Sequence, residues 1–192
     1  MYIGEIMKNI YDYPRESLED YFASINEKKF KATQVYEWLY EKRNSDVNSW
    51  SNIKKDIRDK ILKDFSFDSF AFVKVEKDDL TRKYLFKLND FEKIEAVLMM
   101  HDYGTSICVS SQVGCNMGCA FCESGRLKKV RNLETHEMVE QILLVEKEAN
   151  VRIDSVVIMG IGEPLDNYDN VISFIKIIND AKGIAIGARH IT

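Results

Sequence analysis

The sequence has no long apolar segment. None of its hydrophobic runs approaches the roughly 20 residues that a helix needs to cross a bilayer, although 45% of the 192 residues are hydrophobic. The N-terminal stretch MYIGEIMKNIYDYPRESLEDY also lacks the uninterrupted apolar core of a secretory signal. Internal repeats and low-complexity segments are missing too. These absences argue against a membrane, exported, repetitive or disordered chain, and we expect a cytoplasmic globular protein with a sizeable core.

The sequence also lacks the net positive charge that many nucleic-acid-binding proteins carry. Its formal net charge is -4, so whole-chain electrostatics do not indicate a nucleic-acid partner. The basic residues are nevertheless clustered, and the three groups are Lys28, Lys29 and Lys31; Lys54, Lys55, Arg58 and Lys60; and Arg126, Lys128, Lys129 and Arg131. Taken alone, any one of these groups is typical of a solvated surface.

Cysteine is scarce, and all four cysteines fall between positions 108 and 122. Such crowding would be an unusual way to cross-link a secreted fold. In a reducing compartment it indicates a metal site or redox chemistry instead.

The periodicity of the sequence changes twice along the chain. Apolar residues recur at helical spacing between positions 15 and 65, which predicts a small three-helix module. From about position 68, short alternating stretches separated by DD, ND and HDYG predict strands joined by tight turns. The remaining predicted elements are a strand at 105–111, a helix at 134–149, a strand at 153–159, a helix at 168–181 and a strand from 188.

This alternation of strands and helices predicts an α/β fold with a parallel sheet. A parallel sheet of two and a half strands needs cover on both faces, so we expect the sequence to be part of a longer protein. The predicted domains are a helical accessory domain at 1–66, a β-strand extension at 67–104 and the beginning of a barrel-like core at 105–192.

Three cysteines form the motif GCNMGCAFC, in which Cys115, Cys119 and Cys122 are spaced C-x3-C-x2-C directly after a predicted strand. Three thiolates on one loop can bind three irons of a cubane cluster and leave the fourth iron open to a small chelating ligand. The flanking Gly114 and Gly118 allow the loop to fold tightly. The alternative is structural zinc, which commonly takes two pairs of ligands, and no second pair follows. Three unrelated core cysteines would not explain the shared loop.

This cysteine motif, with Phe121 just before its last cysteine, resembles that of the radical S-adenosylmethionine (SAM) superfamily. A second motif, MGIGEP, ends the next predicted strand and resembles the superfamily's SAM-binding turn. The position is reasonable because ligands of α/β folds gather at the carboxyl ends of parallel strands. The resemblance implies that the 4Fe-4S cluster is held by the three cysteines, and that SAM is contacted by Gly162, Glu163 and Phe121.

Several longer stretches resemble the RlmN/Cfr family of RNA adenosine methyltransferases. They are EKKFKATQVYEWLYEKR, IEAVLMMHDYGTSICVSSQVGCNMGCAFC, LKKVRNLETHEMVEQIL and VVIMGIGEPLDNYDNV, and the similarity covers roughly residues 10 to 192. It implies that one SAM methylates a protein cysteine and that a second SAM is cleaved to a 5′-deoxyadenosyl radical. This radical activates the methyl-cysteine, which then adds to an aromatic carbon of adenine.

The resemblance gives two further residues catalytic roles. Cys108 corresponds to the cysteine that resolves the covalent RNA–protein intermediate by forming a disulfide; the alternative is a small core residue. Glu95 corresponds to the glutamate that takes the proton from the substrate carbon. A lone glutamate in an apolar strand is costly to bury, and burial would raise its pKa toward that of a useful base; the alternative is a solvent-facing strand residue. Gln112, Asn116, His136 and His190 receive no catalytic role.

The family's methyl-carrying cysteine has no counterpart among these four cysteines. We therefore expect the chain by itself to bind a cluster poorly and not to complete methylation. The resemblance favours methylation at C2 of adenosine in 23S rRNA and tRNA. C8 methylation of rRNA, a non-catalytic RNA-binding fragment and a zinc module are the alternatives. The implied partners are RNA, bound partly through the basic group at 126–131, and an electron donor such as flavodoxin or ferredoxin. We expect no membrane partner. We also expect the protein to be a monomer.

Overall fold

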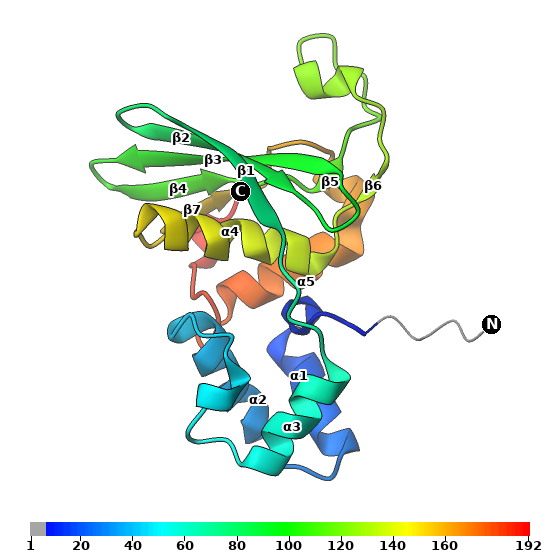
Figure 1. Cartoon of the computed structure of the whole chain (residues 1–192). Coiled ribbons are helices and arrows are strands. Elements are labelled where there is room, and N and C mark those ends of the chain that lie inside the picture. Colours follow the sequence, from blue (N-terminus) through cyan, green and yellow to red (C-terminus); the bar gives the residue numbers. More distant parts are fainter. Residues whose placement is uncertain (1–6) are drawn as a thin grey trace, which may run out of the picture.

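The computed structural model describes residues 7–192, which form a helical module followed by a sheet with helices packed on one face (Figure 1). The module contains a 3-10 turn, three α-helices and two further short turns, and their bounds are η1 Ile10–Asp12, α1 Arg15–Ser24, α2 Phe30–Tyr36, η2 Glu37–Glu41, η3 Val47–Ser49 and α3 Lys55–Asp64. The three predicted helices are therefore confirmed, although the second continues beyond Tyr36 as a π-helical turn.

Aromatic side chains fill the core of this module. Tyr36, Tyr40 and Trp50 are fully buried, and the rings of Tyr36 and Tyr40 pack edge to face with their centroids 4.8 Å apart. Trp38 is partly buried and stacks on Trp50. Large aromatic side chains bury much apolar area per residue, and the second helix with its π-helical continuation contributes three of the rings in this core, those of Tyr36, Trp38 and Tyr40.

Five strands form one sheet in the order β1-β2-β3-β4-β7, with bounds β1 Ala71–Lys77, β2 Thr81–Lys87, β3 Lys93–His101, β4 Gly104–Cys108 and β7 Ser155–Val157. The first four strands are antiparallel neighbours, and only β4 and β7 pair in parallel. The parallel pairing predicted for the core is confirmed, but three antiparallel strands extend the same sheet. The strand predicted from 188 is not formed within the described residues: Ala188–His190 is a 3-10 turn, η6, and Ile191 makes an isolated parallel bridge to Val156 of β7.

Helices α4 (Thr135–Ala149) and α5 (Tyr168–Asn179) accompany this sheet, and α4 runs along one of its faces (Figure 1). Ile94, Ala96 and Leu98 of β3 are buried in the core on that face. Because side chains alternate along a strand, Glu95 and Val97 lie on the opposite face. The remaining short elements are β5 Gln112–Val113, η4 Glu123–Arg126, β6 Arg131–Asn132 and η5 Pro164–Asn167. Among residues 7–192, no helix is long and apolar enough to cross a membrane.

Polar contacts join the helical module to α4 and to the end of α5. The backbone N–H of His136 donates to Asp12 Oδ1 at 2.8 Å, and the His136 ring lies 2.9 Å from the same oxygen. Arg43 Nε donates to Glu146 Oε2 at 2.7 Å, and Arg15 Nε donates to Asp180 Oδ2 at 2.8 Å. The module is thus attached to the core through charged side chains.

The buried Glu140 and the half-buried His136 at this joint are expected to make stability depend on pH. Burial raises the pKa of Glu140 to about 7. Burial alone would lower the pKa of His136, but the hydrogen bond and charge of Asp12 raise it. Both groups therefore hold a proton more tightly in the folded state, so the stability that they contribute at acid pH is lost as the pH rises through their folded pKa values. We expect the free energy of unfolding to fall between pH 5 and 8 by on the order of 2 kcal/mol.

Urea denaturation at both pH values checks this expectation, and Glu140→Gln is the informative variant because its side chain stays neutral. The charged or polar groups around Glu140 are Ser69, the Phe70 backbone N–H, His136, Glu137 and Tyr11. The variant should lose most of the pH dependence between pH 5 and 8 while matching the parent near pH 5. An unchanged pH dependence in Glu140→Gln would contradict the assignment.

Candidate functional site

A long loop follows the carboxyl end of β4 and projects away from the sheet (Figure 1). Short backbone pairings close its base, because Val130 N–H donates to the Val113 carbonyl at 2.8 Å and Cys115 N–H donates to the Leu127 carbonyl at 3.0 Å. Gly114 sits at this closure with φ +71°, and a Cβ there would lie 2.1 Å from the Lys128 carbonyl oxygen. Only glycine fits this position, so the loop is formed by a close approach of two backbone segments.

The three motif cysteines all lie on this loop, and each is a free thiol. Cys115 is buried at the base, Cys122 is half-buried and Cys119 is exposed. Cys122 N–H donates to the Cys119 carbonyl at 3.1 Å, which holds these two close in a tight turn. Phe121, which lies between them, is 94% exposed. Its position does not by itself indicate a contact with a cofactor.

The donor set of the loop fits an iron–sulfur cluster. Three soft thiols are available on one segment, which is the ordinary ligation of such clusters. The thiols are not gathered at one point, since within residues 7–192 no three His, Cys, Asp or Glu side chains are grouped as a metal site.

The MGIGEP turn lies directly against the segment that leads into the cysteine loop. Ser111 N–H and Gln112 N–H both donate to the Ile161 carbonyl, at 2.9 and 3.1 Å. Gly162 has φ +118°, and a Cβ there would lie 2.7 Å from both Ser111 Oγ and Gln112 Cβ. Glu163 N–H donates to Gln112 Oε1 at 2.9 Å. The structure therefore brings the two predicted motifs together, with Gln112 as the link between them.

Buried polar side chains that no sequence motif indicated hold this junction in place. Gln141 of α4 is fully buried; its Oε1 accepts from Ser110 N–H at 2.9 Å and its Nε2 donates to the Ser110 carbonyl at 3.0 Å. Ser110 Oγ in turn donates to the Glu95 carbonyl at 2.7 Å and accepts from Ile161 N–H at 2.9 Å. Gln112 Nε2 donates to Asn132 Oδ1 at 2.9 Å. These residues tie β3, the segment before the cysteines and the MGIGEP turn into one unit.

Replacing Gln141 with leucine should lower the free energy of unfolding by about 2–4 kcal/mol, because two buried backbone groups of Ser110 each lose a partner worth about 1–3 kcal/mol. Gln34→Leu is the matched control, since Gln34 Oε1 is buried without a hydrogen-bond partner among the described residues. Its replacement should change stability by less than about 1 kcal/mol. Urea denaturation midpoints measure both effects. Equal losses in the two variants would show that the hydrogen bonds of Gln141 to Ser110 do not stabilise the junction.

Glu95 and Cys108 occur on the face of the sheet opposite α4. Cys108 pairs in register with Val97, two residues from Glu95, so the two side chains are diagonal neighbours. Burial raises the pKa of the half-buried Cys108 thiol. Glu95 is not buried: its side chain is 38% exposed, and its Oε1 lies 2.8 Å from Lys83 Nζ. The arrangement matches the solvent-facing alternative for Glu95, but keeps it on the same face as Cys108.

The basic group at 126–131 is largely paired with acidic side chains. Arg131 donates to both carboxylate oxygens of Glu137 at 2.7 Å and to Asp90 at 2.6 Å. Arg126 lies 3.4 Å from Glu123. The expectation that this group forms one basic surface is therefore wrong for Arg131, whose guanidinium is held by two carboxylates.

Two family models, several relatives and a solved structure match this chain. The family model "Ribosomal RNA large subunit methyltransferase N-terminal domain" matches residues 8–66, and that of the "Radical SAM superfamily" matches residues 109–192. The chain is 51% identical over 191 residues to the "Probable dual-specificity RNA methyltransferase RlmN" of Enterococcus faecalis, covering 96% of this chain and 54% of that protein. The N-terminal part of the chain therefore resembles the RlmN N-terminal domain, and its C-terminal part resembles the radical SAM superfamily. A second RlmN relative, from Acholeplasma laidlawii, is 49% identical over 184 residues, covering 95% of this chain and 54% of that protein.

A solved structure resembles this chain over nearly its whole length. It is described as a radical SAM methyltransferase from Sphaerobacter thermophilus, with a TM-score of 0.84 and 32% sequence identity, and the match covers 96% of this chain and 55% of that one. The chain spans about half the length of the RlmN relatives it matches. The match to the radical SAM superfamily model implies a 4Fe-4S cluster and SAM as cofactors. The domain bounds and the individual residue roles stay predictions.

Proposed function

We propose that this chain is the N-terminal part of a radical SAM methyltransferase that methylates C2 of adenosine in 23S rRNA and tRNA. The observation that carries the proposal is the junction at Gln112, where the cysteine segment and the MGIGEP turn share backbone and side-chain hydrogen bonds. Relatives named as dual-specificity RNA methyltransferases support the RNA substrate.

In this proposal residues at different positions bind the cluster and SAM. Cys115, Cys119 and Cys122 would hold the cluster, and the turn at Gly162 and Glu163 would bind SAM. When bound, the cluster and SAM would supply the radical chemistry needed to methylate a carbon that is not nucleophilic.

Two residues on the open face of the sheet would act on the substrate. Glu95 would accept the proton from the adenine carbon, and its ion pair with Lys83 would have to open first. Cys108 would resolve the covalent RNA–protein intermediate through a disulfide. A methyl-carrying cysteine would be a fifth cysteine, outside these 192 residues, because the sequence has four and each has a role here.

We further propose that the protein works in the cytoplasm as a monomer and takes electrons from a donor such as flavodoxin or ferredoxin. The helical module would add positioning contacts to folded RNA, which proteins recognise by shape as well as by sequence.

The deciding experiment uses a full-length protein that contains this chain. After anaerobic reconstitution, the protein is incubated with SAM, a reductant and 23S rRNA or tRNA, and the RNA is digested for mass analysis of the nucleosides. We expect 2-methyladenosine in both RNAs and none from residues 1–192 alone. 8-Methyladenosine would overturn the regiochemistry, and full methyl transfer by residues 1–192 would overturn the division of roles.

A further inference from the structure

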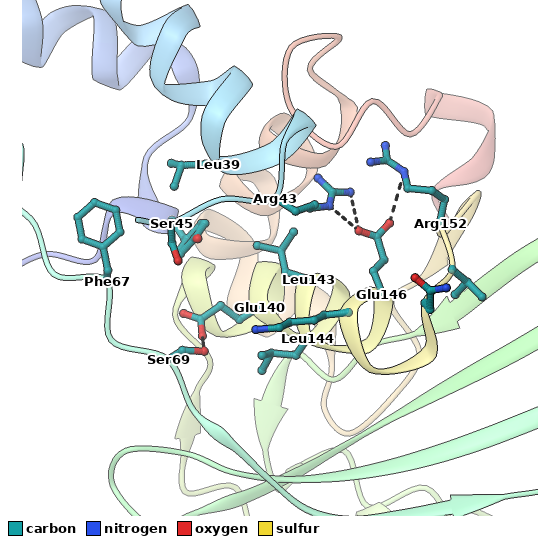
Figure 2. A pocket seen from close by; sticks show the side chains of 14 residues that line it. Leu39, Arg43, Ser45, Phe67, Ser69, Glu140, Leu143, Leu144, Glu146 and Arg152 are labelled. Atoms are coloured by element: carbon teal, nitrogen blue, oxygen red, sulfur yellow. Dashed lines mark hydrogen bonds and ion pairs between the residues drawn. The ribbon is translucent and has the colours of Figure 1, made fainter. Parts of the chain in front are cut away.

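A cavity of about 620 Å³ lies between the helical module and α4, away from the cysteine loop (Figure 2). Its volume lies within the roughly 300–1,000 Å³ of small-molecule sites in proteins. The walls come from η1, the end of the second helix, the segment after α3 and α4 with the turn that follows it. None of the candidate cluster, SAM or catalytic residues lines it, so the proposed reaction leaves the cavity without a role.

The cavity has an acidic end. Glu140 is only 2% exposed, and its Oε2 accepts a hydrogen bond from the Ser69 hydroxyl. Its other oxygen, Oε1, is buried and has no hydrogen-bond partner within the described part of the chain. Figure 2 shows the Glu140 carboxylate beside Ser69 and near Ser45 at one side of the cavity.

The other end is basic and also has an unused hydrogen-bonding group. Arg43 donates through Nε to Glu146, and Arg152 Nε lies 3.8 Å from the same carboxylate, so two cations share one anion. Arg43 Nη1 is buried without a hydrogen-bond partner among residues 7–192. The excess positive charge and the free donor favour an anionic group here. Figure 2 shows this Arg43–Glu146–Arg152 group on the opposite side of the cavity from Glu140.

Apolar side chains occupy the space between these ends, chiefly Leu39, Leu143 and Leu144 (Figure 2). Glu140 and Glu146 are six residues apart on α4, which corresponds to about 9 Å along the helix axis. Each buried polar atom left unpaired costs about 1–3 kcal/mol. A ligand with an apolar body, an N–H group at one end and an anion at the other would pair both ends at once.

We propose that this cavity binds a small aromatic carboxylate that carries an N–H donor at the end opposite its carboxylate. The N–H would donate to Glu140 Oε1, and the carboxylate would accept from Arg43 Nη1. The site is independent of the proposed methyl transfer, because neither the cysteine loop nor the MGIGEP turn contributes to it.

Indole-3-propionate is a suitable probe, because its indole N–H and its carboxylate lie at opposite ends of an apolar body. It is titrated into the 15N-labelled 192-residue chain, and amide shifts are followed by NMR. We expect saturable shifts centred on Ser45, Asn150 and Val151, which line the cavity. Absence of shifts, or shifts confined to the open face of the sheet, would mean that the cavity holds only water and would overturn the proposal.

Two analogues test the two ends without altering the protein. 1-Methylindole-3-propionate lacks the N–H, and indole-3-propionamide lacks the charge. Each should bind about tenfold more weakly, as expected for the loss of one hydrogen bond to a charged group. Equal affinities for all three compounds would show binding by apolar contact alone and would overturn the proposed ligand chemistry.

A pair of variants locates the binding. Leu143→Trp should fill the cavity and abolish the shifts, whereas Leu62→Trp makes the same change on α3 at a residue that is 40% exposed and outside the cavity. The NMR spectra themselves report whether each variant is folded. If Leu143→Trp folds and still binds the probe with parental affinity, the cavity is not the site.

Discussion

Replacing Cys115, Cys119 or Cys122 with alanine in a full-length protein that contains this chain is expected to lower the iron and sulfide retained after anaerobic reconstitution by at least about tenfold, because even the loss of an outer partner costs a metal site about 10–100-fold. The three thiols lie on one loop between β5 and β6, and within residues 7–192 no histidine or carboxylate is grouped with them as a substitute ligand. A cluster bound there would therefore lose one of its three protein ligands. Iron and sulfide analysis together with the brown cluster absorbance measure the effect.

Cys108→Ala is the matched control for these variants. Cys108 is also a free cysteine, but it ends β4 on the open face of the sheet, before the loop begins. The control should retain as much iron and sulfide as the parent protein. Zinc in place of iron in the parent protein would instead support the zinc module, and equal losses in all four variants would indicate that cluster loading follows general misfolding.

Most of the elements that periodicity predicted have apolar residues buried in the core, although β1, which was also predicted, is mostly exposed. Helices α4 and α5 have buried apolar stripes, and β2 and β3 alternate between core and open face. The parallel pairing of β4 with β7 followed from the same alternation of strands and helices. The 3-10 turn at Ala188–His190 could not be predicted in this way, because it has no distinctive apolar pattern.

The positioning residues were missed because their partners are distant in sequence. Gln112 bonds to residue 163, and Gln141 bonds to residue 110. One signal was available for Gln141, which falls on the apolar stripe of α4 between Met138 and Val145. A polar side chain on a buried stripe needs a partner, so its position alone indicated a structural hydrogen bond, although not which group it would meet.

The charges of the site depended on tertiary pairing that sequence clustering does not show. Arg131 belongs to a basic run, yet in the fold it binds Glu137 and Asp90. For Glu95 the sequence left a buried base and a solvent-facing strand residue open, and β3 places it on the open face next to Lys83. In both cases the ion-pair partner lies on another element, so the local sequence did not show how the side chain would be paired.

Replacing Gly114 with alanine is expected to open the base of the cysteine loop. The new Cβ would lie 2.1 Å from the Lys128 carbonyl oxygen and 3.1 Å from that of Leu127, and both are backbone atoms that cannot rotate away. The pairings of Cys115 with Leu127 and of Val113 with Val130 would have to separate. Hydrogen exchange at these amides should then accelerate by at least about tenfold, since each 1.4 kcal/mol of lost protection is a factor of ten.

Gly118→Ala separates this clash from backbone strain alone. Gly118 has a similar φ of +62°, but a Cβ there would meet nothing within 4 Å. The control therefore carries only the strain of a left-handed alanine, about 1–2 kcal/mol, confined to an open loop. Its exchange at Cys115 and Val130 should match that of the parent, and its iron content after reconstitution should exceed that of Gly114→Ala. If the two variants show the same exchange rates and the same iron contents, the contact with Lys128 does not determine the shape of the loop. If the exchange rates differ but the iron contents agree, the contact determines the shape of the loop but the loop does not hold a cluster.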